Sequence, residues 1–115
     1  MFEYNAIITS VHDGDTLRAD MDLGFGIWIK DQPIRVYGVD TPELITSEGK
    51  KASEVVKALL PVGSKIVIIT FKGKREKYGR YLGKIKLPNG EDLASYLIAN
   101  GLAKPYFGGT KETEP

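Results

Sequence analysis

Acidic side chains at predicted turns and strand ends are the first residues in this sequence that could do chemistry. Asp13 and Asp15 lie two residues apart in an Asp-Gly-Asp turn, and Asp40 and Glu43 follow a predicted strand. Carboxylates at neighbouring strand ends can converge on one hard cation, and oxygen ligands alone suit Ca²⁺ or Mg²⁺. The chain has no cysteine and one histidine, too few sulfur and nitrogen ligands for a zinc site. The simpler interpretation, which spacing alone favours, is that the aspartates are turn and cap residues.

A basic segment at residues 72–86 is the second candidate. It holds five lysines and two arginines against a single acid, with tyrosines between them. Lysine attracts phosphate, arginine offers a planar pair of donors for phosphate oxygens, and tyrosine rings can stack on bases. In the run Lys77-Tyr78-Gly79-Arg80, the glycine would let the backbone turn sharply and aim the arginine. The alternative interpretation is a solvated hairpin, which is what most charge runs are.

Predicted strands and helices must bring these residues together. Hydrophobic alternation predicts strands over residues 4–11, 16–21, 27–30 with 34–39, 64–71 and 81–87, and connections over 23–26 and 72–80. Helical spacing predicts helices over 47–60, with Ser47 as N-cap, and over 92–100, which Gly101 would end in a left-handed cap. Three strand regions, a helix, two strands and a helix are the order of an OB-fold barrel, an α+β fold. We expect one domain over residues 1–107 and a flexible tail over 108–115.

Composition limits the class of protein. The 115 residues fit one domain, and 42% hydrophobic with 27% charged residues is ordinary for a globular protein. No apolar run approaches the ~18 residues of a membrane span, and we expect no signal peptide at the N-terminus. Localisation stays open between the cytoplasm, as default, and a secreted mature form. The formal charges of the first 49 residues sum to −6 and those of the remainder to +7. Chance explains this division, but a metal site beside a site for a polyanion would also need it.

Four short motifs occur in the order and with nearly the spacing of one known family. They are Asp13-Gly14-Asp15-Thr16, Arg35 with Val39-Asp40-Thr41-Pro42-Glu43, Lys77-Tyr78-Gly79-Arg80 and Gly101-Leu102-Ala103-Lys104. Over residues 4–107 the chain therefore resembles the staphylococcal nuclease (thermonuclease-like) family. It departs from the family pattern in the loop between Phe71 and Lys77, which is shorter, and at Tyr106, which comes early.

The resemblance implies a metal site and a general base. Asp15 and Asp40 would bind Ca²⁺ through their carboxylates, and Thr41 would bind it through its backbone carbonyl. Glu43 would hold the attacking water as general base. Asp13 is interpreted as a partner that orients Asp15 or the turn, and not as a ligand.

The resemblance also implies how a polynucleotide is held. Arg35 and Arg80 would clamp the scissile phosphate, where fixed cations stabilise the charge that grows during in-line attack. Lys77 and Tyr78 would hold a neighbouring phosphate, and Tyr106 would stack on the nucleotide. The family hydrolyses DNA and RNA and leaves 3′-phosphate ends, so the same reaction is expected of this chain.

Three functions from different classes remain open. The first is a calcium-dependent nuclease acting on DNA, RNA or both, with single strands preferred, no membrane partner, and a monomer expected although a dimer is allowed. The second is a non-catalytic OB-fold module that binds nucleic acid. The third is a protein-interaction barrel whose acidic cluster binds a structural ion. The presence of all five charged candidates, Asp15, Arg35, Asp40, Glu43 and Arg80, argues against the second.

Overall fold

The computed structural model describes residues 2–75 and 79–107, with the backbone alone at 71–75. The candidate substrate residues Lys77 and Tyr78 and the predicted tail 108–115 lie outside this part of the chain. The elements in chain order are β1 (Phe2–Asp13), β2 (Thr16–Gly24), β3 (Ile27–Val36), β4 (Gly38–Asp40), α1 (Ser47–Leu59), β5 (Lys65–Arg75), β6 (Tyr81–Lys86), α2 (Leu93–Ala99) and β7 (Lys104–Tyr106).

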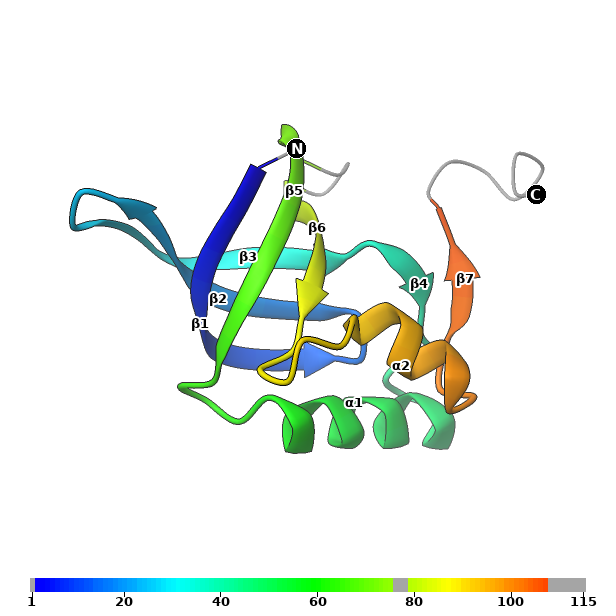
Figure 1. Cartoon of the computed structure of the whole chain (residues 1–115). Helices are drawn as coiled ribbons and strands as arrows, with labels where there is room; N and C mark the ends of the chain where they lie inside the picture. The colour runs from blue at the N-terminus through cyan, green and yellow to red at the C-terminus, as the bar shows by residue number, and fades with distance from the viewer. Residues whose placement is uncertain (1, 76–78, 108–115) are drawn as a thin grey trace.

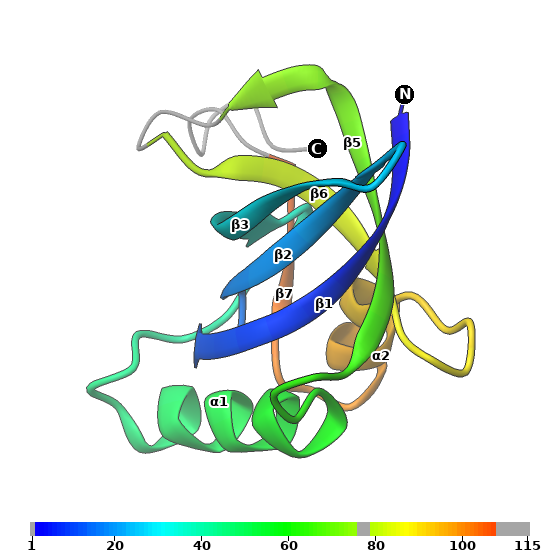
Figure 2. The same cartoon turned by 90° about the vertical axis from the view of Figure 1, so that its left-hand side faces the viewer.

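Five of the strands form a closed barrel in the order β1-β2-β3-β6-β5, and β5 returns to pair with β1. β3 and β6 run parallel, while the other neighbouring pairs run antiparallel. α1 follows the third barrel strand and lies across one end of the barrel, and α2 follows the fifth (Figures 1 and 2). The predicted α+β fold, a five-stranded OB-fold barrel with these two helices, is confirmed.

The core fills the barrel because apolar residues alternate along its strands. Successive strand residues point to opposite faces, so every second side chain enters the interior. The side chains at most 2% exposed include Ala6 and Ile8 of β1, Leu17 and Ala19 of β2, Ile34 and Val36 of β3, and Val56 of α1. Leu93 and Leu97 of α2 pack against the same cluster. This cluster holds the strand ends in fixed positions.

The β2–β3 hairpin is longer than predicted. The predicted strand piece 27–30 and residues 34–36 of the predicted piece 34–39 belong to one strand, and the edge or irregularity predicted at Pro33 is present as a register shift between Ile29 and Gln32, with Asp31 at φ of 52°. β3 pairs with β6 only over Ile34–Val36, so Pro33 precedes the part of the strand that is flanked on both edges and can accommodate a proline. The hairpin projects away from the barrel, with Phe25 at its turn (Figure 1).

Helix boundaries follow the capping residues. Thr46, and not the predicted Ser47, is the N-cap of α1, because its side chain accepts a hydrogen bond from the Gly49 amide. Asp92 caps α2 in the same way through the Ser95 amide. Gly101 follows α2 with φ of 71°, the left-handed conformation that was predicted for it.

Two strand segments were missed. β5 continues to Arg75, although residues 72–75 were predicted as loop. β7 was not predicted; it pairs antiparallel with β4, so that Tyr106 lies opposite Gly38 and Lys104 opposite Asp40. Neither helix in the part of the chain that is described is long and apolar enough to cross a membrane.

Candidate active site

The β1–β2 turn and the segment after β4 meet at one end of the barrel. Asp15 leaves this turn and is 7% exposed. Its Oδ2 accepts a hydrogen bond from the Thr41 amide at 3.0 Å, and its Oδ1 accepts one from the Thr16 hydroxyl at 3.2 Å. The two segments are 26 residues apart in sequence, and the Asp15 carboxylate joins them directly.

Arg35, near the end of β3, reaches both candidate metal ligands. Its Nη2 lies 3.6 Å from Asp15 Oδ2 and 3.5 Å from Asp40 Oδ1. Its Nη1 donates to the carbonyls of Val36 at 2.8 Å and Val39 at 2.9 Å, which fixes the plane of the guanidinium. The Asp15 and Asp40 carboxylates therefore lie close together, both within 3.6 Å of one nitrogen atom.

Arg80 approaches the same place from the start of β6. Its Nη1 donates to Thr16 Oγ1 at 3.1 Å, and that hydroxyl donates in turn to Asp15. Gly79 has φ of 83°, a conformation in which glycine carries no steric cost, so the backbone turns sharply immediately before the arginine. Arg35 thus contacts Asp15 directly, whereas Arg80 is connected to it through the Thr16 hydroxyl.

Tyr106 lies beside the arginine cluster because β7 pairs with β4. The Arg35 Cζ is 6.0 Å from the centroid of its ring, within reach of a cation–π interaction. The ring is half-buried. The candidate substrate residues Lys77 and Tyr78 lie outside the residues that the structure describes.

Glu43 is placed by its backbone, two residues after Thr41. Its carbonyl accepts hydrogen bonds from the amide of Thr46 at 2.9 Å and from the Thr46 hydroxyl at 2.7 Å. The residue is exposed. Within residues 2–75 and 79–107, no hydrogen bond or ion pair joins its carboxylate to Asp15, Asp40 or Arg35.

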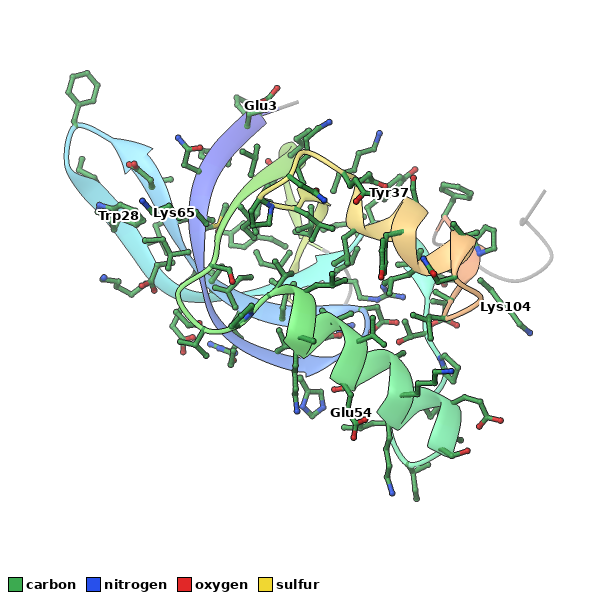
Figure 3. The ribbon with its side chains drawn as sticks, turned by 60° about the horizontal axis from the view of Figure 1, so that its bottom comes forward. Glu3, Trp28, Tyr37, Glu54, Lys65 and Lys104 are labelled. Carbon is green, nitrogen blue, oxygen red and sulfur yellow. The ribbon has the colours of Figure 1, made fainter. Side chains whose placement is uncertain are left out.

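Helix α1 contacts both the β1–β2 turn and the segment after β4. Its residue Glu54 is exposed to solvent (Figure 3). The Ser53 hydroxyl donates to the His12 carbonyl at 3.1 Å, at the end of β1. A Cβ on Gly14 would lie 2.6 Å from Thr41 Cγ2 and 3.1 Å from Ala52 Cβ. The turn can approach Thr41 and α1 this closely only because residue 14 has no side chain.

Charge and burial separate the two aspartates of the turn. Burial by itself raises the pKa of Asp15, but hydrogen bonds with Asp13 and the Thr41 amide, together with the positive Arg35, outweigh it and lower the pKa below its ordinary value. Burial and the neighbouring Asp15 raise the pKa of Asp13. Asp15 is therefore the member of the pair that stays ionised.

The oxygen donors at this point fit a hard cation better than a soft one. The Asp15 and Asp40 carboxylates both lie within 3.6 Å of Arg35 Nη2, and oxygen ligands of this kind are the ones that Ca²⁺ and Mg²⁺ prefer. Among the residues whose placement is described, no group of three Asp, Glu, His or Cys side chains could hold a metal ion.

A pocket of about 410 Å³ adjoins the site. Its lining runs from Asp40 and Thr41 across the first turn of α1 to the segment 100–104. Of the two candidate carboxylates, Asp40 lines this pocket.

Sequence reasoning missed the residues that connect the others. Thr16 links Arg80 to Asp15, and its only signal was its position directly after the Asp-Gly-Asp turn. Thr46 donates hydrogen bonds to the Glu43 carbonyl and Gly49 leaves room for it, and nothing in the types of these two residues indicated either contact.

Comparison with known proteins gives one matching family model, described as staphylococcal nuclease homologue, over residues 33–115. The chain is 31% identical over 116 residues to the endonuclease YhcR of Bacillus subtilis, covering 91% of this chain and 9% of that protein. It is 31% identical over 99 residues to an uncharacterized endonuclease of Escherichia coli, covering 86% of this chain and 59% of the relative. It is 33% identical over 107 residues to a thermonuclease of Staphylococcus hyicus, covering 87% and 58%. The chain thus spans less than two thirds of each of these relatives.

Proposed function

This chain belongs to the family of staphylococcal nuclease homologues, and we propose that it is a Ca²⁺-dependent nuclease that hydrolyses phosphodiester bonds of DNA, RNA or both. One observation carries the proposal: Arg35 Nη2 lies within 3.6 Å of both Asp15 and Asp40. Two carboxylates that could bind a cation therefore lie next to a guanidinium that could bind a phosphate. The names of the relatives, endonuclease and thermonuclease, support the same reaction class.

In the proposed site, the carboxylates of Asp15 and Asp40 and the carbonyl of Thr41 would hold Ca²⁺. The ion would supply Lewis-acid stabilisation of negative charge on the phosphoryl oxygens. The lowered pKa of Asp15 supports this role, because an ionised carboxylate is the form that binds a cation. Asp40 is exposed on its side chain, which leaves the site open to a polymer.

Glu43 is the proposed general base. Its carboxylate would accept a proton from the attacking water, whose oxygen forms the new bond to phosphorus. The P–O5′ bond breaks as the new bond forms, and the leaving 5′ oxygen takes a proton from solvent water, which leaves a 3′-phosphate on one product and a 5′-hydroxyl on the other. The exposure of Glu43 supports this role, since water reaches its carboxylate without displacing protein.

Arg35 and Arg80 are proposed to donate hydrogen bonds to the non-bridging oxygens of the scissile phosphate. Negative charge on these oxygens grows during in-line attack, so fixed cations stabilise the transition state more than the bound substrate. The two carbonyl hydrogen bonds of Arg35 support its role, because they hold the guanidinium in place before substrate arrives.

The proposed substrate contacts extend beyond the scissile bond. Lys77 and Tyr78 would hold a neighbouring phosphate, and the ring of Tyr106 beside Arg35 would stack on a base. Stacking requires an unpaired base, so we expect single strands to be cut faster than duplex. A monomer carries all of these residues on one chain.

A cleavage assay tests the proposal. Purified protein is incubated with single-stranded DNA and with plasmid, first with Ca²⁺ and then with chelator. We expect cleavage with Ca²⁺ alone, and a loss on the order of 10²–10⁴-fold in a folded Glu43→Gln variant, the range that a general base contributes. A salt-sensitive gel shift with intact DNA would contradict the proposal and identify a non-catalytic binding module instead.

A further inference from the structure

The backbone of Glu43 is tied to the start of α1 by one threonine. The Thr46 amide and the Thr46 hydroxyl both donate to the Glu43 carbonyl, at 2.9 and 2.7 Å. The same hydroxyl oxygen accepts a hydrogen bond from the Gly49 amide at 2.9 Å, and this bond caps the N-terminus of the helix. The side chain that begins α1 therefore also holds the carbonyl of the proposed base.

Gly49 makes room for that carbonyl. It is buried in the first turn of α1, where a Cβ would overlap the Glu43 carbonyl oxygen and lie 2.8 Å from the Pro42 carbonyl oxygen. Both obstacles are backbone atoms, which cannot rotate away as the end of a flexible side chain can. Residue 49 is helical and not among the glycines with positive φ, so it is glycine here for space and not for conformational freedom.

The second turn of α1 fixes the other half of the site. Ala52 lies against Gly14, and the Ser53 hydroxyl holds the His12 carbonyl. The segment that carries Asp15 and the segment that carries Glu43 thus rest on the same helix, one turn apart. A small change in how the Glu43 segment sits on α1 changes its position relative to Asp15.

We propose that Thr46 and Gly49 are positioning residues that hold Glu43 at its working distance from Asp15 and Asp40. This inference rests on the proposed function, because it assumes that Glu43 acts as the base. Within residues 2–75 and 79–107 the Glu43 carboxylate has no hydrogen bond or ion pair that would hold it, so the backbone anchor determines where the carboxylate can reach.

Three variants test the anchor. Thr46→Val keeps the shape but removes the hydroxyl, Thr46→Ser keeps the hydroxyl, and Gly49→Ala adds the obstructed Cβ. A misplacement of about 1 Å can cost on the order of 10²-fold in rate. We expect Thr46→Val and Gly49→Ala to lower kcat for single-stranded DNA by roughly 10- to 100-fold with KM changed less than about twofold, and Thr46→Ser to restore kcat.

Two controls separate positioning from loss of stability. Asp92→Ala removes the N-cap of α2, which has no part in the site, and should lower Tm comparably while kcat stays at the parental value. In a Glu43→Gln background, Thr46→Val should cause no further loss of kcat, because the group that it positions is already gone. A full additional loss there would overturn the proposal and show a general structural effect.

The outcomes also distinguish this inference from the proposed function. If the parent protein cuts with Ca²⁺ and Glu43→Gln abolishes cutting, yet Thr46→Val and Gly49→Ala cut at the parental rate, the anchor is refuted and the function stands. If Glu43→Gln cuts at the parental rate, the function as proposed fails, and the anchor fails with it.

Discussion

Replacing Arg35 by methionine should destabilise the protein by about 3 kcal/mol. The side chain is 13% exposed and faces Asp15, which is 9% exposed on its side chain. Removing one partner of a buried ion pair costs ~3–5 kcal/mol, mainly because the other charge is left without compensation. The long ion-pair distances of 3.5 and 3.6 Å and the 61% exposure of Asp40 reduce the cost to the lower end of that range.

The hydrogen bonds of Arg35 lead to a similar magnitude. Its Nη1 donates to the carbonyls of Val36 and Val39 at 2.8 and 2.9 Å. Each hydrogen bond that involves a charged group contributes ~1.5–3 kcal/mol. Because native proteins have only ~5–15 kcal/mol of stability in total, the loss will be visible in a denaturation curve.

Urea denaturation of four proteins measures the effect: the parent, Arg35→Met, Asp15→Asn and the double variant. We expect the double variant to be more stable than additivity predicts by about 1–2 kcal/mol, since the neutral asparagine needs no cation. Arg18→Met is the matched control, because the Arg18–Asp31 pair is 45% and 57% exposed and should matter much less. An Arg35→Met variant as stable as the parent, or strictly additive effects, would refute the assignment of a coupled buried pair.

Two further predictions concern the β2–β3 hairpin. Phe25 is fully exposed and has φ of 56°, a conformation that costs a bulky L-residue about 1–2 kcal/mol. Because asparagine tolerates this conformation better, Phe25→Asn should raise Tm. A lower Tm would show that the ring has a partner. The hydrogen bond from Thr9, followed by that from Arg18, lowers the pKa of Asp31 below 3.8. The ionised Asp31 carboxylate therefore stabilises the folded protein above pH 3.8, and this stabilisation is lost as the pH falls through the lowered pKa of Asp31. Asp31→Asn should thus lower Tm at neutral pH and leave it unchanged in strong acid. A Tm difference that persists in acid would disprove the charge-based explanation.

The barrel could be predicted because its signal is local. Alternation in β1 and β2, helical spacing after Thr46 and the left-handed Gly101 each depend on a few neighbouring residues. Pro33 marked an edge and an irregularity as predicted, whereas the continuity of β3 on either side of it depends on pairing with β2, which is a matter of tertiary structure. The choice between Thr46 and Ser47 as N-cap could not be made from type, since both are good caps, and it was settled by the contact with Glu43.

The candidate residues could be named from sequence, whereas their connections could not. Asp15, Asp40 and Arg35 were selected by type and order within motifs. The Thr41 amide on Asp15 and the Thr16 hydroxyl between Arg80 and Asp15 depend on how strand ends meet in space. β7 has only three residues, one of them proline, too short for a periodic signal, yet its pairing brings Tyr106 to Arg35.

The most direct test of the metal-assisted site is the rate of DNA cleavage measured against Ca²⁺ concentration for the parent, Asp40→Asn and Asp22→Asn. Asp22 accepts a hydrogen bond from the Gly24 amide at the far end of β2, and asparagine can accept the same bond. The Asp22→Asn control should therefore cut DNA at the parental rate at each Ca²⁺ concentration. Loss of partners that merely orient metal ligands costs ~10–100-fold, so loss of Asp40, a proposed ligand, should cost at least as much at any given Ca²⁺ concentration. Cleavage that persists in chelator, or an Asp40→Asn variant with the parental Ca²⁺ dependence, would contradict the account.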